Sequence, residues 1–577
     1  MQKGSFISAS SKPMLLIILV SGFILPRIST LSRPHHLMVP HFNPFPGEQS
    51  YQQSINLALQ GRAEEATRIL YNFLVNARGD STVRRAYRDI YDILSVRERR
   101  EYRQAKDKAR WLLRFWRHND PTPATLVNER YVEHCKRLAY ARKHFRSPQP
   151  RGYDDRGVIY LRYGPPDDKY VSNLGESTRD NESWVYHRFK DVSFDFVEFG
   201  GVFWIVNDLR RAIVPVNNKL VILTHLFEER SQLSLAYQIT AWQLQQKLLG
   251  LNHNSVESIL QYEYLQRVDK VKVSLPTRTS DFAPEEKSLP FWAMTAAFAT
   301  GYFPDRMRRA SLSTPGSGPN RKLTRLELYY AIPLHKIFAQ KLFNQKGPAL
   351  LDLNFAIFDK KDDLVLQHHD SLQLDLASVL AQNDYLGQLT FFLEPDTYRV
   401  ALDFLSRKTH QRGLMQIQMD VQDFSGGKLG MSDIELASEV RPARQTDREK
   451  GFIKHGLYVH PYPYNAIPRE QPISLYYEVY NLQPDTSGTT RYTVTYEVEQ
   501  RGGKGVLAML SALNPFGGKK SSLSLLYHFT SKDRHRADYT SLDFSRLKPG
   551  KHVLVVKVKD EVSGQEVSRR LKFNIMP

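Results

Sequence analysis

The sequence predicts a multidomain α+β protein: a helical N-terminal region, a small α+β domain and two tandem β-sandwich (Ig-like) domains. The 577 residues correspond to several domains at roughly 100–200 residues each. Apolar residues recur at helical spacing near the N-terminus, whereas the second half alternates with period two between turn residues. The hydrophobic content of 41% is enough for packed cores and excludes a globally disordered chain.

The predicted domain boundaries follow changes in composition and periodicity. In chain order we expect a signal peptide or N-terminal anchor (1–30), a linker (31–48), a helical region with a tetratricopeptide-like hairpin (49–100), an α+β domain (101–216), a mainly helical connector (217–287) and two β-sandwiches (288–443 and 444–577). The boundary between the sandwiches is expected near 440–452, where charged residues crowd a polar stretch.

The N-terminus resembles an export signal. Lys3 and Lys12 precede a twelve-residue apolar run, Met14 to Leu25, which is shorter than the roughly 20 residues of a spanning helix. A basic segment before a short apolar run is typical of a secretory signal, and an uncleaved anchor stays open. We therefore expect an exported protein that is periplasmic or associated with the outer membrane.

The formal net charge of +19 predicts attraction to polyanions, namely nucleic acid, anionic lipid or acidic polysaccharide. Export favours envelope proteins and anionic envelope polymers or lipid as partners over nucleic acid. The single cysteine, Cys135, excludes an intrachain disulfide. It shares an apolar helical face with Tyr131 and Leu138, so a buried, inert thiol is expected.

Residues 49–118 are predicted to be helical. The stretch 61–66 resembles the turn of one tetratricopeptide unit, and a single unit indicates a helical hairpin rather than a solenoid. Trp111 and Phe115 share a face beside a basic stretch, which predicts an amphipathic helix with a solvated basic side. Thr122 is expected to cap the next helix, with Pro123 at its first position.

The segment 151–167 carries the most distinctive pattern. Val158 to Tyr163 alternates and predicts a strand. Asp154 and Asp155 are expected to fix the turn before it by accepting backbone N–H groups. The prolines that follow lack N–H donors and end the strand.

Residues 85–205 resemble the GWxTD-domain family of bacterial proteins. The matching blocks are Phe115 to Pro123, Asn128-Glu129, Ala139 to Ala141, His144-Phe145, Asp155 to Gly157 and Tyr160 to Asp167. The namesake motif is replaced by the shorter Gly152-Tyr153-Asp154-Asp155. The motif residues, for which we expect a structural role, are Trp116, Asp120, Pro121, Gly152, Tyr153, Asp154, Asp155, Arg156, Gly157, Tyr163, Gly164, Pro165, Pro166 and Asp167. The resemblance implies an exported or envelope-associated protein, and it provides no catalytic residue, cofactor or metal ligand.

The C-terminal half shows an internal duplication. Leu328-Tyr329-Tyr330 recurs 147 residues later as Leu475-Tyr476-Tyr477. The stretch beginning at Leu393 recurs 154 residues later at Leu547. Two similar offsets in the same order predict two copies of one sandwich, with a barrel as the competing architecture.

Other candidate sites in the sequence favour structural roles. His368 and His369 are adjacent on a predicted strand and point to opposite faces, which disfavours a shared metal. The glycine-rich stretches 502–505 and 517–520 lack phosphate-loop spacing and are expected to be hairpin tips. The aromatic segment 458–464 is expected to pack between domains, with a carbohydrate- or partner-facing strip as the alternative.

These observations favour a non-catalytic, exported scaffold or interaction protein of the cell envelope that uses no cofactor. One alternative is an envelope enzyme acting on glycan, with Asp154, Asp155 and Asp167 as the first suspects. A second is a protein that binds a polyanion, either lipid or nucleic acid. Carboxylates that converge in a cleft would favour the enzyme, whereas carboxylates bonded to local backbone would argue against it.

Overall fold

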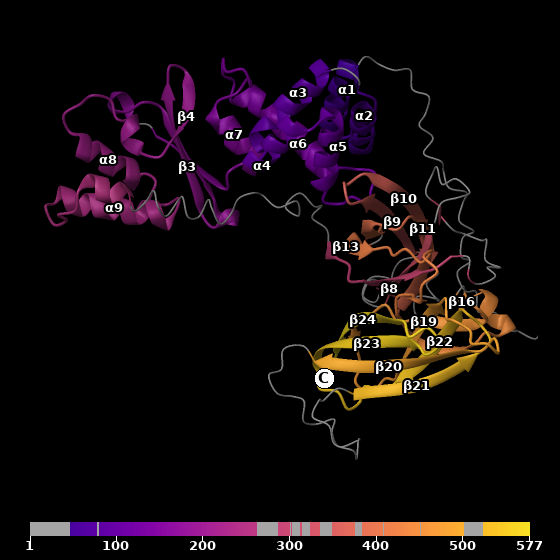
Figure 1. Ribbon diagram of the computed structural model, residues 1–577. Coiled ribbons are helices and arrows are strands. Elements are labelled where there is room, and N and C mark those ends of the chain that lie inside the picture. Colours follow the sequence, from indigo (N-terminus) through magenta and orange to yellow (C-terminus); the bar gives the residue numbers. More distant parts are fainter. Residues whose placement is uncertain are drawn as a thin grey trace, which may run out of the picture.

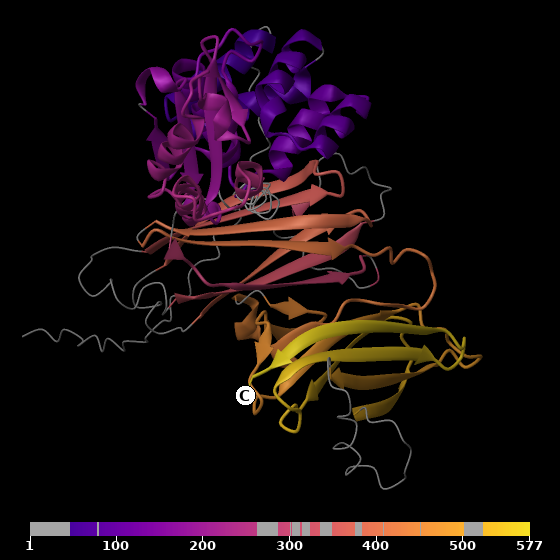
Figure 2. The ribbon, with the colours of Figure 1, turned by 90° about the vertical axis from the view of Figure 1, so that its left-hand side faces the viewer.

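The computed structural model describes residues 47–576, except 78–79, 173, 262–286, 301, 303–311, 314–322, 335–348, 375–383, 408, 450–451 and 501–522. A helical region and a small α+β unit lie at one end, followed by a first and then a second β-sandwich (Figures 1 and 2). The predicted fold class is confirmed. The predicted signal, residues 31–46 of the predicted linker and the two glycine-rich tips lie outside the described residues, whereas Gly47 and Glu48 begin the first helix.

The helical region packs around one apolar core. Its elements are α1 (Gly47–Leu59), α2 (Ala63–Asn76), α3 (Asp80–Ile90), η1 (Tyr91–Ile93), α4 (Val96–Gln104), α5 (Lys108–His118) and α6 (Glu129–His144). The predicted hairpin is formed by α1 and α2, which turn at Gly61 with a positive φ. Cys135 is buried in this core, and burial raises the pKa of its thiol to about 12, as expected for an inert side chain.

The helix after the Asp120–Pro123 break begins later than predicted. Its N-cap is Asn128, whose Oδ1 accepts from the N–H of Tyr131 at 2.8 Å. The expected cap, Thr122, instead donates its hydroxyl to Glu129 at 2.6 Å. Tertiary contacts explain the difference, because buried Asn128 also donates to the carbonyl of Trp116 at 2.7 Å.

The α+β unit packs three helices around a four-stranded antiparallel sheet. The elements are α7 (Asp155–Tyr163), β1 (Asp168–Val171), β2 (Asn181–Tyr186), β3 (Val192–Phe199), β4 (Val202–Val206), α8 (Lys219–Glu228) and α9 (Leu235–Leu248). Gly200 and Gly201 form the turn between β3 and β4 with positive φ. The predicted helical connector is α8 and α9.

Val158 to Tyr163 is helix α7, so the predicted strand is wrong. The period-two pattern arises because two faces of the helix are buried against different partners. Ile159 and Tyr163 pack on the sheet beside Trp184, whereas Leu161 packs on α6 and Tyr153. Burial on two sides therefore produces apolar alternation in a helix.

The first sandwich consists of two facing sheets around a shared core. Its strands are β5 (Lys287–Ser288), β6 (Trp292–Phe298), β7 (Leu312–Ser313), β8 (Thr324–Pro333), β9 (Ala349–Asp359), β10 (Leu364–Leu374), β11 (Asp384–Leu393), β12 (Thr397–Ser406) and β13 (Gln411–Asp420). One sheet has the order β10-β9-β12-β13-β5 and the other β6-β8-β11-β7.

The second sandwich repeats this plan. Its strands are β14 (Gly430–Met431), β15 (Glu435–Pro442), β16 (Ile453–Lys454), β17 (Leu457–Pro461), β18 (Ala466–Ile467), β19 (Ile473–Tyr480), β20 (Thr490–Gln500), β21 (Leu523–Ser531), β22 (Arg536–Leu542), β23 (Gly550–Asp560) and β24 (Glu566–Ile575). The order β21-β20-β23-β24-β18 matches β10-β9-β12-β13-β5, including a short parallel strand at the edge.

Equivalent side chains support the predicted duplication. Tyr398 and His552, 154 residues apart, each bond the carbonyl four residues earlier, at 2.9 and 2.8 Å respectively. The repeated Leu-Tyr-Tyr segments lie in β8 and β19, which are both inner strands of their sheets. The matched topology thus agrees with both sequence offsets.

The predicted boundary between the sandwiches is misplaced. β15 pairs with β17 and β19, so residues 435–442 belong to the second sandwich, and the chain passes between them from Asp420 to Gly430. The polar stretch near 440–452 is not a linker. Its charges close a turn, because Arg441 pairs with Asp447 at 2.9 Å.

The helical region docks on the first sandwich through one tight turn between β9 and β10. Arg110 and Arg114 both pair with Asp363, at 2.7 and 2.8 Å. The neighbouring Asp362 pairs with His118 and with Arg399. Ala124 adds an apolar contact with β9 and β12.

A buried network of charges joins the two sandwiches. Lys454 of β16 lies 2.5 Å from Glu327 of β8 and also bonds Glu435 of β15. All three side chains are almost fully buried. Burial raises the pKa of Glu435 to about 7 against the attraction of Lys454.

A second branch of this network starts at Arg325, which pairs with Glu327 at 3.1 Å and with Glu478 at 3.0 Å. Burial alone would raise the pKa of Glu478, but its bond to His455 and the charge of Arg325 lower it to about 2. Both sandwiches contribute charges that have no access to water, so the junction is stable only while each charge keeps its partner.

We predict that Lys454→Met destabilises the sandwich pair by about 3–5 kcal/mol, because it leaves the buried Glu435 without its cation and Glu327 with Arg325 alone. Urea unfolding of the full chain measures this change. The matched control is Lys360→Met, which breaks the exposed pair with Asp396 and should cost less than about 1 kcal/mol. Equal unfolding midpoints for the two variants would contradict the prediction.

Candidate functional site

The motif residues at 116–121 stabilise the helical region. Trp116 is buried and packs edge-on against Tyr131 at 5.1 Å between ring centroids. Asp120 accepts from the N–H of Thr122 at 2.9 Å, and burial raises the pKa of its carboxyl well above the usual value. Pro121 is buried beside it. These residues form a turn in the interior with no open face for a substrate.

Asp154 and Asp155 connect the start of α7 to its surroundings. Asp154 caps α7 by accepting from the N–H of Arg156 at 3.0 Å and also pairs with that guanidinium at 2.7 Å. Asp155 accepts from the N–H of Ile205 in β4 at 2.9 Å and from Arg151 at 2.6 Å. Each of the two carboxylates therefore accepts a hydrogen bond from a backbone N–H and pairs with an arginine.

Arg156 joins the helix to the sheet. Its guanidinium reaches Glu182 of β2 at 2.6 Å and lies 3.6 Å from the centre of the Phe203 ring in β4. Charge pairing and stacking on one guanidinium fix the orientation of α7 over the sheet.

The motif glycines are required by close packing. A Cβ atom at Gly157 would lie 2.5 Å from the ring of Tyr153, which is closer than any side chain tolerates. Gly152 has a φ of +85° at the turn before Tyr153. Gly164 ends α7 with a φ of +77°, and a Cβ there would meet Arg137 at 2.8 Å.

The end of the motif is held by one arginine. Arg188 donates to the carbonyls of Tyr163 and Pro165, each at 2.6 Å, and also pairs with Asp167. Asp167 accepts from the N–H of Arg188 at 3.1 Å. Pro166 is half-buried in the link from α7 to β1. Asp167 thus has its own partner, and its contacts lie apart from those of Asp154 and Asp155.

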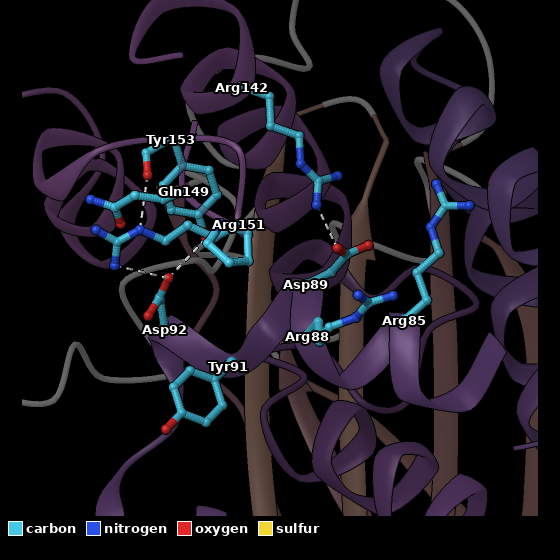
Figure 3. A pocket seen from close by; sticks show the side chains of 10 residues that line it. Arg85, Arg88, Asp89, Tyr91, Asp92, Arg142, Gln149, Arg151 and Tyr153 are labelled. Carbon is cyan, nitrogen blue, oxygen red and sulfur yellow. Dashed lines mark hydrogen bonds and ion pairs between the residues drawn. The ribbon is translucent and has the colours of Figure 1, made fainter. Parts of the chain in front are cut away.

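The structure brings motif and non-motif residues together around one pocket of about 400 Å³ (Figure 3). It lies where α3, η1 and the end of α6 meet the loop that precedes α7. Its lining consists of Arg85, Arg88, Asp89, Tyr91, Asp92, Arg142, Gln149, Pro150, Arg151 and Tyr153. Of the predicted motif residues, Tyr153 lines this pocket.

Both carboxylates of the pocket wall are already bonded. Asp89, with 3% exposure, accepts from Arg142 at 2.6 Å and from Tyr51 at 3.0 Å. Asp92 accepts from the hydroxyl of Tyr153 at 3.0 Å, and Arg151 approaches it at 3.9 Å. Figure 3 shows Arg142 reaching toward Asp89 and Arg151 toward Asp92. Burial raises the pKa of Tyr153, so its hydroxyl remains a donor.

Sequence reasoning missed the pocket arginines because they come from separate segments. Arg85 and Arg88 lie one turn apart on α3, Arg142 lies near the end of α6, and Arg151 is in the following loop. The spacing of Arg85 and Arg88 was the one available signal, and it is also typical of a solvated helix face.

A second surface that the sequence reasoning did not identify is the outer face of α9. Leu235, Trp242 and Leu249 follow one another at intervals of seven residues, and their side chains are 64%, 59% and 65% exposed. The opposite face, which includes Tyr237 and Leu244, is buried against α8 and β2. Seven-residue spacing places the three exposed side chains on one stripe.

The remaining predicted candidates are structural. Tyr464 donates to Asp384 and packs against Trp292, so the aromatic segment lies between the sandwiches as predicted. His369 bonds Asn354, whereas His368 stacks on Phe355, which places the two rings apart. Among the described residues no group of three or more His, Cys, Asp or Glu could hold a metal ion.

Within the same described ranges, no helix has the length and apolar character needed to cross a membrane.

No family model and no curated protein matches the chain. Solved structures with partial similarity include trypsin-activated alpha-2-macroglobulin from Escherichia coli, at 9% identity and a TM-score of 0.16 over 51% of this chain and 16% of that one. The fibronectin(III)-like modules of Clostridium thermocellum CbhA match at 8% identity and a TM-score of 0.11 over 46% of this chain and 88% of that one. Scores this low carry no argument about function.

We predict that Gly157→Ala destabilises the α+β unit by about 1–3 kcal/mol, since the added methyl overlaps the ring of Tyr153. Thermal unfolding followed by near-ultraviolet circular dichroism measures the loss. Gly426→Ala is the matched control, because a Cβ there meets no atom within 4 Å. An unchanged melting temperature for Gly157→Ala would show that Tyr153 moves aside without cost.

Proposed function

We propose that this protein is an exported, non-catalytic scaffold or interaction protein of the bacterial cell envelope, related to the GWxTD-domain family. The observation that carries the proposal is the apolar outer face of α9, with Leu235, Trp242 and Leu249 in solvent. Large apolar side chains that gather on one exposed helix face are a usual sign of an interaction site.

The contacts of the suspect carboxylates support a non-catalytic role. Asp154, Asp155 and Asp167 each accept a backbone N–H and each pair with an arginine. A carboxylate that acts as a general acid or a nucleophile must face the substrate and have a pKa suited to that role. The three carboxylates instead face backbone at three places around α7, which disfavours the glycan-hydrolysing alternative.

A second copy of this chain is the partner that the α9 face fits best. The stripe is symmetrical about Trp242, with a leucine seven residues before and seven residues after it. An antiparallel pairing about a two-fold axis would place Trp242 against itself and Leu235 against Leu249 of the other copy. The stripe contains no charged residue, so two chains of net charge +19 can approach there without local repulsion.

The test places a photo-cross-linking amino acid at position 242 of the tagged full-length chain, as Trp242→p-benzoylphenylalanine, in a bacterial host. We expect irradiation to produce a covalent dimer that fractionates with the envelope. The matched control carries the same substitution at Tyr539, an exposed aromatic residue of β22 in the second sandwich, and should give little dimer.

Each part of the proposal can fail separately. Recovery of the chain in the cytoplasmic fraction would overturn export. Equal dimer yields from positions 242 and 539 would overturn the α9 interface. A specific adduct with a different protein at position 242 would preserve the interaction role and replace the second copy as the partner.

A further inference from the structure

We propose that the arginine-lined pocket between α3, α6 and the 149–153 loop binds a small organic anion through its phosphate or carboxylate group. This site is distinct from the α9 face, and it depends neither on export nor on self-association. The pocket has a wall rich in arginine donors, one lining arginine with no partner among the described residues, and a volume suited to a small molecule.

The pocket wall has more hydrogen-bond donors than acceptors. Four guanidinium groups line it. The two carboxylates of the wall, Asp89 and Asp92, are each bonded by an arginine or tyrosine donor. A ligand that supplies acceptor oxygens would complete this wall.

Internal ion pairing explains only part of the cluster. Arg142 neutralises the buried Asp89, and Arg151 pairs with Asp155 at 2.6 Å, so both have a structural purpose. Arg85 reaches outward to Glu48 at 2.8 Å and to Gln52 at 2.7 Å.

Arg88 differs from the other three arginines. It is exposed at the pocket and makes no hydrogen bond or ion pair within the described residues. A structural cluster has no need of this unpaired guanidinium, whereas an anion site uses it. Figure 3 shows Arg88 beside Asp89 and Arg85 on the α3 side of the pocket, with Gln149 on the loop side.

The electrostatics favour an anion over a neutral ligand. Among the described residues Arg85, Arg142 and Arg151 are each paired with a carboxylate, so the uncompensated positive charge of the lining is that of Arg88. Guanidinium groups bind carboxylate and phosphate oxygens in pairs with fixed geometry, and partial burial strengthens each bond relative to water.

The cavity size restricts the ligand. A volume of about 400 Å³ lies in the range of roughly 300–1,000 Å³ that small-molecule sites occupy. One sugar-sized group with a single anionic substituent fills such a space. Phosphate and carboxylate satisfy the same donors, so a phosphorylated sugar and an acidic sugar are the two sources to distinguish.

Isothermal titration calorimetry of the full-length protein tests the proposal with three probes of matched size: glucose 6-phosphate, glucuronate and glucose. We expect at least one of the two anions to bind saturably with one site per chain, and glucose to give no binding. The anion that binds more tightly identifies the preferred acidic group. Binding should weaken as salt is raised, because the contacts are ionic.

Two variants assign the binding to this pocket. Arg88→Gln removes a guanidinium without unpairing a carboxylate and should weaken anion binding by about tenfold or more. Gln149→Glu adds a negative charge to the pocket lining and should weaken anion binding by charge repulsion. The matched control is Arg68→Gln, an exposed arginine of α2 outside the pocket lining, which should bind as the parent does.

Three results would overturn the proposal. These are the absence of saturable binding by either anion at low salt, binding of glucose as tight as that of the anions, and equal weakening by Arg88→Gln and Arg68→Gln. The last result would mean that the net positive charge of the chain attracts anions without a defined site.

Discussion

The buried charge network between the two sandwiches is the constraint on which the C-terminal half of the molecule depends. Lys454 lies between Glu327 and Glu435 away from water, and Arg325 joins Glu327 to Glu478. Buried charges are stable only in a geometry that pairs each of them, because an unpaired buried charge lowers the stability of the fold by several kcal/mol. The network therefore restricts the relative orientation of the two sandwiches, which also share an apolar cluster that includes Phe298 and Tyr476.

The other end of the molecule uses exposed rather than buried ion pairs. Asp362 and Asp363 lie on one turn of the first sandwich. They pair with Arg110, Arg114 and His118 of α5 and with Arg399 of β12. Pairs that are partly solvated contribute less each and are screened by salt. The helical region is thus held on the first sandwich by ion pairs that ionic strength weakens and by the apolar contact of Ala124.

The family-like segment has a structural role that explains its unusual residue pattern. Gly157 leaves room for the Tyr153 ring, and Asp154 caps α7. Tyr153 then donates to Asp92 and completes the wall of the pocket. The motif itself supplies no free carboxylate; its contribution is to place the loop that bears Gln149 and Arg151 opposite α3. Any activity at this site comes from arginines outside the motif.

Sequence alone determined the fold class, the hairpin of α1 and α2 and the duplicated sandwiches, because apolar periodicity and turn residues act over short ranges. It could not determine that 158–163 is a helix, since burial on two faces imitates strand alternation. It also could not place the sandwich boundary, where Arg441 and Asp447 form a turn instead of a linker. Only the tertiary structure shows the pocket. Its arginines come from separate segments of the chain, and no local sequence pattern indicates that they lie close together.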